Sequence, residues 1–204
     1  MESANTGVVW AAPIGRHSVV GALDRFGRCA RIVAMTTALE VARDELFGAG
    51  PGCLEPEDLE AHAIWTSVDY LQGFAQEALE GTLSRDALIR TADEVERLSD
   101  PIRRRPGGTG EARYVLLVAV TSAAHALLGQ ADQDAFAVWA ATMAVEAHHE
   151  PGRPLALPGT TIEDPGEPLR LPAARDVRRA FLARWWTTLT NRLPFRDATR
   201  ATFS

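Results

Sequence analysis

The sequence predicts an all-α protein: a helical bundle of about six helices in one domain, residues 1–204, with a central buried fourth helix. Apolar residues recur at three- and four-residue steps in six segments, the spacing that lines one face of a helix. The only segment that suggests an extended strand is GVVWAAPI near the N-terminus, so no sheet is expected. The 204 residues are 46% hydrophobic and 24% charged, the balance of a globular chain long enough to bury a core.

The first two helices are predicted over residues 18–47 and from Pro56 to Gly81. The first ends at the sequence GAGPG, which combines residues that tolerate a left-handed backbone with a helix breaker. Proline is favoured at the first position of a helix, and the acidic side chains of Glu57 and Asp58 suit the positive end of the helix dipole.

The third helix is predicted over residues 85–98, with Ser84 as its N-cap, a buried Leu98 and a stop at Pro101. A basic linker, SDPIRRRPGGTG, follows it. The fourth helix, residues 111–128, is apolar nearly all round through YVLLVAV, which is typical of a helix surrounded by others.

The fifth helix is expected to begin near Asp132, and the sixth to cover about residues 174–193. Between them, residues 150–173 hold half of the prolines of the chain. A connection of this length without secondary structure is usually functional or disordered. The chain then closes with a basic helix and tail, residues 174–204.

All basic side chains other than histidine are arginine, and they are unevenly distributed. Residues 1–169 hold 13 Arg and 25 acidic residues, whereas residues 170–204 hold eight Arg and two Asp. Two interpretations stay open: the basic tail docks on the acidic body, or it binds an anionic partner. The net charge of −6 argues against general nucleic-acid binding, which normally requires a basic domain.

A cytoplasmic location is expected. The N-terminal sequence lacks the basic and apolar regions of a signal peptide, and no apolar run approaches the roughly 20 residues of a membrane span, so no membrane partner is predicted. Cys29 and Cys53 are interpreted as reduced thiols.

The chain has none of the common motifs of nucleotide, serine-hydrolase or zinc chemistry, and no cofactor is predicted. The segment Glu146-Ala-His148-His149-Glu150 looks like a metal cluster when written as a string. On a helix, however, the two histidines point about a quarter-turn apart, so the prediction for metal is none. Histidines in a last turn instead favour the negative end of the helix dipole.

Two polar stripes supply candidate catalytic residues. Tyr114, Ser122 and His125 share one side of the predicted fourth helix, while His62 and Asp69 follow the predicted second helix at helical spacing. The stripes either satisfy one another as a structural network or line a pocket in which a His–Asp pair performs acid–base chemistry.

The last helix supplies candidate partner-binding residues. Trp185 continues its apolar face, so Trp186 is expected off that face with Arg178 and Arg179. A tryptophan beside arginine is typical of an interface hot spot, although the Pro-rich segment is an alternative cover for it.

The segments FGRCARIV, QEALEG and YVLLVAVTSAAHALLGQADQDAFAVWAATMAVEA together resemble the YjaG-like family of uncharacterised helical bacterial proteins, to which immunity proteins of toxin systems are related. The resemblance covers roughly residues 26–150 and carries over no functional residue. It implies a non-catalytic role in binding another protein.

Two functions are therefore carried forward. The first is a non-enzymatic interaction protein, such as an immunity or regulatory protein, whose acidic body binds a basic partner. The second is a small helical enzyme or ligand-binding protein of specialised metabolism, with a small-molecule pocket between the second and fourth helices. A nucleic-acid-binding regulator is disfavoured, because only the arginines of the linker and tail support it.

Overall fold

The computed structural model describes residues 21, 23–103, 109–151 and 172–193. Within these ranges the chain is helical and contains no strand, which confirms the predicted all-α class. A short 3-10 turn, η1, separates the first two of six long helices. The elements are α2 (Arg28–Phe47), η1 (Pro51–Cys53), α3 (Leu59–Glu80), α4 (Arg85–Arg103), α5 (Thr109–Leu127), α6 (Gln133–His149) and α7 (Pro172–Arg192).

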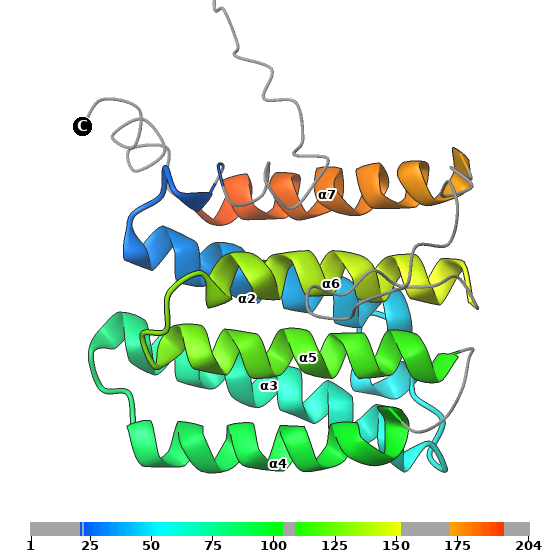
Figure 1. The fold of residues 1–204 in the computed structure, drawn as a ribbon, viewed down its shortest axis with the longest axis horizontal. Coiled ribbons are helices and arrows are strands. Elements are labelled where there is room, and N and C mark those ends of the chain that lie inside the picture. Colours follow the sequence, from blue (N-terminus) through cyan, green and yellow to red (C-terminus); the bar gives the residue numbers. More distant parts are fainter. Residues whose placement is uncertain (1–20, 22, 104–108, 152–171, 194–204) are drawn as a thin grey trace, which may run out of the picture.

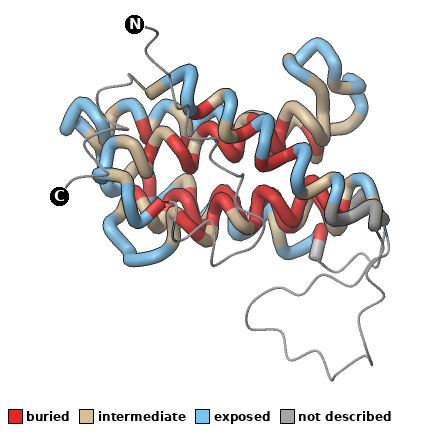
Figure 2. The backbone as a smooth tube through the Cα atoms, turned by 90° about the horizontal axis from the view of Figure 1, so that it is seen from above, coloured by how far each residue is buried: buried red, intermediate tan, exposed pale blue. Residues whose placement is uncertain are grey.

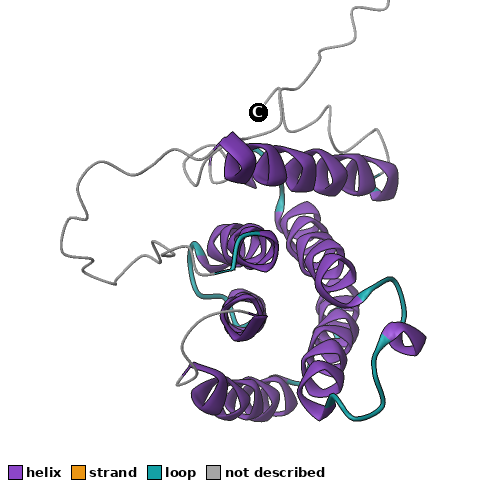
Figure 3. Cartoon of the chain, turned by 90° about the vertical axis from the view of Figure 1, so that its right-hand side faces the viewer, coloured by secondary structure: helices purple, strands orange, loops and turns teal. Residues whose placement is uncertain are grey.

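The helices form a stack that is one helix deep at each end and two helices deep in the middle (Figures 1 and 3). α5 packs against α2, α3, α4 and α6, and α6 packs against α2, α5 and α7. The predicted central helix is therefore α5, and α6 shares the centre with it. Figure 2 shows the buried residues along the inward faces of these helices. α4 and α7 lie at opposite ends of the stack.

The prediction of one uninterrupted helix over residues 18–47 is wrong. Leu23 is buried and helical, but residues 24–26 form a turn, closed by a hydrogen bond from the Phe26 amide to the Leu23 carbonyl. α2 then begins at Arg28 with Gly27 as its N-cap. Apolar spacing continues across the turn, so periodicity alone did not detect it. Residues 18–20 lie outside the described ranges.

The second predicted helix begins later than expected. Residues 56 and 57 belong to a turn, and α3 starts at Leu59. Its N-cap is Asp58, whose carboxylate accepts a hydrogen bond from the Ala61 amide. The predicted end is confirmed, since Gly81 caps the helix with a left-handed φ of 77°.

Pro101 does not stop the third predicted helix. α4 continues through it to Arg103, which extends the helix beyond the predicted residue 98. The N–H that the proline lacks would donate to the Arg97 carbonyl, so one hydrogen bond of the ladder is missing, but only two residues of the helix follow the proline. Leu98, which was expected to be buried, is 37% exposed.

The start of α6 near Asp132 is confirmed, and Asp132 adopts a left-handed φ of 61°. α7 begins at Pro172, two residues earlier than predicted. Most of the Pro-rich segment, residues 152–171, lies outside the described part of the chain.

α7, the described part of the basic C-terminal region, is docked on the acidic body, as the first interpretation of the charge asymmetry predicted; residues 194–204 lie outside the described ranges. Trp185 is fully buried and its indole N–H donates to the Ala34 carbonyl at 2.8 Å. Three arginines of α7 pair with glutamates of α2 and α6. The pairs are Arg178–Glu146, Arg184–Glu45 and Arg192–Glu40.

None of the helices in the described ranges is long and apolar enough to cross a membrane.

Candidate functional site

The two histidine and aspartate candidates on α3 have partners other than each other. The ring Nε2 of His62 lies 3.2 Å from the Glu55 carbonyl oxygen, and Asp69 accepts a 2.8 Å hydrogen bond from the Arg43 guanidinium. Arg43 is itself buried and stacks 4.2 Å over the ring of Trp65. Asp69 and Asp44, which accepts two further hydrogen bonds from the same guanidinium, therefore together neutralise a buried arginine between α2 and α3.

The three candidates on α5 also belong to the helix packing. Ser122 is buried and its hydroxyl donates to the Val118 carbonyl of its own helix at 2.8 Å. Tyr114 packs half-buried against the core, and His125 is half-buried. Neither of the two surface depressions described below is lined by any of the five residues of the polar stripes.

The partner-binding candidates on α7 differ in their surroundings. The prediction that Arg178 lies off the packed face is wrong. Its guanidinium makes two hydrogen bonds to Glu146, a carboxylate that is 2% exposed, and lies 5.0 Å over the Trp139 ring. The Glu146 hydrogen bond is the main reason that the pKa of Arg178 is raised. Arg179, by contrast, is exposed.

Trp186 is half-buried rather than open to solvent. It stacks on Phe26 with ring centroids 6.1 Å apart and contacts Trp185 edge-on at 5.9 Å. Its cover comes from the turn before α2, and not from any described part of the Pro-rich segment.

The histidines at the end of α6 do not gather with carboxylates into a metal site. Glu146 is held by Arg178, while His149 lies 3.0 Å from a Glu45 oxygen. The His148 and His149 rings meet edge-on at 5.2 Å. In the ranges that the structure describes, no group of three His, Cys, Asp or Glu side chains is placed to hold a metal ion.

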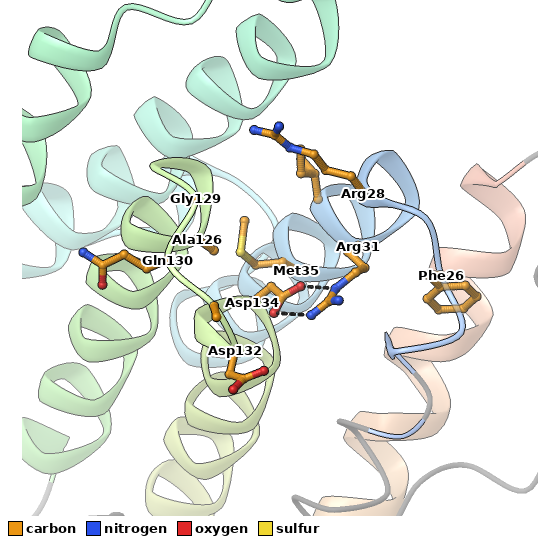
Figure 4. Close-up of a pocket in the computed structure, with 11 residues that line it drawn as sticks. Phe26, Arg28, Arg31, Met35, Ala126, Gly129, Gln130, Asp132 and Asp134 are labelled. Carbon is orange, nitrogen blue, oxygen red and sulfur yellow. Dashed lines mark hydrogen bonds and ion pairs between the residues drawn. The ribbon is translucent and has the colours of Figure 1, made fainter.

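A cavity of about 270 Å³ lies between the start of α2 and the turn that joins α5 to α6 (Figure 4). At its centre, the Arg31 guanidinium donates two hydrogen bonds to the Asp134 carboxylate, and this pairing is the main reason that the pKa of Arg31 is raised. Ile32 and Met35, both buried, add apolar surface. This cavity could not be predicted from the sequence, because its walls come from two turns and the helix ends beside them rather than from one helical stripe.

The second depression is an open hollow along the surface of α4, lined by Asp93, Glu96, Arg97 and Asp100. It belongs to a wider acidic surface. Residues 55–103 hold twelve acidic side chains and four arginines, whereas α7 holds five arginines and one aspartate. We call α3, α4 and the segment that leads into α3 (residues 55–103) the acidic layer. It includes the end of the stack that lies farthest from α7 (Figure 1).

The acidic layer also carries large apolar side chains that are open to solvent. Tyr70 on α3 is 62% exposed, and Ile89 and Leu98 on α4 are about two-fifths exposed. In the described part of the chain, every large hydrophobic side chain that is classed as exposed belongs to α3 or α4. The five are Leu59, Tyr70, Leu79, Ile89 and Leu98.

The sequence signal for this surface was available but was interpreted differently. α4 has apolar residues on one side and charged residues on the other. Leu98 was predicted to be buried because it follows the spacing of the apolar side, but it is exposed. The outward position of Tyr70, more than a third of a turn away from the stripe of α3, follows from the same helical geometry.

Comparison with models of protein families, with curated protein sequences and with solved structures gave no match. The resemblance to the YjaG-like family therefore stays a prediction.

Proposed function

We propose that this protein is a non-enzymatic interaction protein that uses its acidic layer to bind and mask a basic surface of a partner protein, in the manner of an immunity or regulatory protein. One observation carries the proposal: the excess of negative charge and the exposed large apolar side chains occur on the same two helices.

Each half of that observation matches a known property of interfaces. Large exposed apolar patches rimmed by polar residues mark binding surfaces, and tyrosine is enriched among the residues that dominate binding energy. Complementary charge at the rim accelerates encounter and excludes wrong partners. Tyr70 would anchor the partner, and acids such as Asp93 and Glu96 would face its basic groups.

The surroundings of the layer support binding rather than catalysis. Its histidine and aspartate candidates are engaged by a backbone carbonyl and by a buried arginine. Two copies of the layer would repel each other because both are negative, so a basic partner fits this face better than a second copy does. Cys29 and Cys53 are free and exposed, which fits the reducing conditions of the cytoplasm.

The proposal is tested by titration calorimetry, in which an amphipathic helical peptide of leucine and arginine is titrated into the protein. The test variant, Asp93→Asn/Glu96→Gln/Asp100→Asn, neutralises the outer face of α4. We expect it to weaken binding by about threefold to a hundredfold at low salt, because each rim charge contributes about 0.2–1 kcal/mol.

A matched control changes the net charge by the same amount at acids outside the layer. It is Asp24→Asn/Glu111→Gln/Asp176→Asn, in which Asp24 and Asp176 are exposed and Glu111 is half-buried. This control should bind almost as well as the unmodified chain. Equal weakening in both triple variants would show that only net charge matters and would refute the acidic layer as a binding site. Tyr70→Ala should also weaken binding of the peptide. This loss should remain at high salt, where the charge interactions are screened.

A further inference from the structure

The cavity at the start of α2 is separate from the acidic layer and has two walls, from two separate parts of the chain. Residues of the turn before α2 and of its first two turns form one wall, and the α5–α6 turn forms the other. Its volume of about 270 Å³ is slightly below the about 300–1,000 Å³ that is usual for ligand pockets, so a ligand would be small.

The charges that line the cavity are balanced but separated. Arg31 and Asp134 satisfy each other through their paired hydrogen bonds. Arg28 and Asp132 remain, and both are exposed. Figure 4 shows them on opposite sides of the Arg31–Asp134 pair.

Asp132 is held in place by its backbone, and its carboxylate is not used by the helix that it precedes. It is the only non-glycine residue of the described ranges with a positive φ, 61°, and its side chain makes no capping hydrogen bond to α6. An N-cap aspartate usually accepts such a bond. The carboxylate of Asp132 is therefore available at the edge of the cavity.

The surface between the two charges is partly apolar. Ile32 of α2 is 7% exposed, and the half-buried Ala126 of α5 also lines the cavity. An apolar group placed there would be removed from water, which contributes about 0.8 kcal/mol for each buried methylene.

We propose that this cavity binds a small zwitterion whose acidic and basic groups are separated by an apolar spacer. The acidic group lies against the Arg28 guanidinium, which can donate two parallel hydrogen bonds to a carboxylate. The amino group lies against the Asp132 carboxylate, and the spacer lies on Ile32 and Ala126. A ligand with only one charge would leave either Arg28 or Asp132 unmatched. This site does not depend on the proposed binding of a basic protein.

The probe for the test is a series of straight-chain ω-amino acids of increasing length, titrated into the full chain by calorimetry. We expect one length to bind most tightly, because only one spacing of the charges matches the cavity. At that length, the corresponding fatty acid and the corresponding alkylamine should each bind at least about tenfold more weakly, because each lacks one charge-assisted hydrogen bond.

Two substitutions assign the ends of the ligand. Arg28→Gln should weaken binding of the ω-amino acid and of the fatty acid but leave binding of the alkylamine unchanged. Asp132→Asn should weaken binding of the ω-amino acid and of the alkylamine but leave binding of the fatty acid unchanged. Asparagine tolerates a left-handed backbone, so the second change should preserve the turn, which circular dichroism and a thermal melt would verify. Arg90→Gln on α4 is the control for loss of a distant exposed arginine and should change none of the affinities.

The proposal is refuted if no member of the series binds at millimolar concentration. It is also refuted if the fatty acid or the alkylamine binds as tightly as the best ω-amino acid. An affinity for the ω-amino acid that is unchanged in both variants would equally exclude Arg28 and Asp132 as its ligands.

Discussion

Glu146 shows how a single buried charge is tolerated in this fold. Its carboxylate is 2% exposed near the end of α6, and Arg178 of α7 meets it with two hydrogen bonds, one of 2.9 Å. A buried charge that loses its partner has neither water nor a counter-ion to stabilise it, so removing one member of such a pair costs more than the pair contributes.

Arg178→Gln should therefore lower the free energy of unfolding by about 2–3 kcal/mol, somewhat less than a fully buried pair because Arg178 is partly exposed. Urea denaturation at neutral pH measures the change. Glu146→Gln leaves an arginine that solvent can still reach, and should cost about 1 kcal/mol. The neighbouring Arg179→Gln, at an exposed position, should change stability by no more than about 0.5 kcal/mol. Similar losses for Arg178 and Arg179 would contradict the role of the pair.

His148 is the residue from which we expect a pH effect. Burial lowers its pKa below the usual 6.5, nearby His149 and Arg113 lower it further, and Glu45 acts in the opposite direction. The unfolded chain consequently binds a proton at this side chain more readily than the folded chain does. The free energy of unfolding should be constant, as far as His148 is concerned, above about pH 7 and should fall as the pH drops below 6.5.

His148→Gln should reduce the slope of stability against pH between pH 6.5 and the lowered pKa of His148. Urea denaturation across this range measures the slope, and the two proteins should differ by a constant amount above pH 7. An unchanged slope in the variant would show that another group is responsible.

At the scale of whole elements, the start of α3 combines a helix cap with a contact between helices. Asp58 accepts the Ala61 amide hydrogen bond and also pairs with Arg113 of α5, with an Nη1–Oδ1 distance of 3.1 Å. The Arg113 hydrogen bonds are the main reason that the pKa of Asp58 is lowered, and the Ala61 amide adds to the effect. One carboxylate thus caps the N-terminus of α3 and links α3 to α5.

Two substitutions separate these roles. Asp58→Asn keeps an effective N-cap but loses the charge, and should cost less than about 1 kcal/mol because the ion pair is partly exposed. Asp58→Ala loses both and should cost about 1–2 kcal/mol. Because the pKa of Asp58 is lowered on folding, its contribution is present above about pH 4 and is lost at more acidic pH. Urea denaturation of both variants at neutral pH, and of the unmodified chain at acidic pH, tests this; equal losses for the two variants would leave no role for the cap.

The elements also show which features of this fold could be predicted from the sequence. Six helices, their order and the central place of α5 follow from apolar periodicity, because burial selects one residue type at a fixed spacing. The turn at residues 24–26 and the extension of α4 past Pro101 did not follow, because each depends on a few local hydrogen bonds that leave the periodicity unchanged. The stripes of polar residues were found, but their partners were not, since Arg43 reaches Asp69 from another helix.

At the scale of the whole molecule, charge is distributed along the stack of helices. The arginines of α7 are largely used to dock that helix, while the acids of α4 face solvent. Acids on the outer face of α4 are close to each other as well as exposed: Glu96 has Asp93 three residues before it and Asp100 four residues after it. Like charges at these spacings destabilise a helix by about 0.2–0.5 kcal/mol per pair. A surface kept for binding a basic partner would retain this cost.

Glu96→Gln should consequently raise the free energy of unfolding by about 0.4–1 kcal/mol at low salt, because it removes two like-charge pairs. The gain should disappear in high salt, which screens exposed charges. Glu94→Gln is the matched control on another face of α4. Glu94 has Arg90 four residues before it and Arg97 three residues after it, so its loss should lower stability by a similar amount. Thermal and urea unfolding at two salt concentrations measure both effects. If Glu96→Gln destabilised the chain as Glu94→Gln does, the outer face of α4 would carry no electrostatic cost, and no binding partner would be needed to account for its acidity.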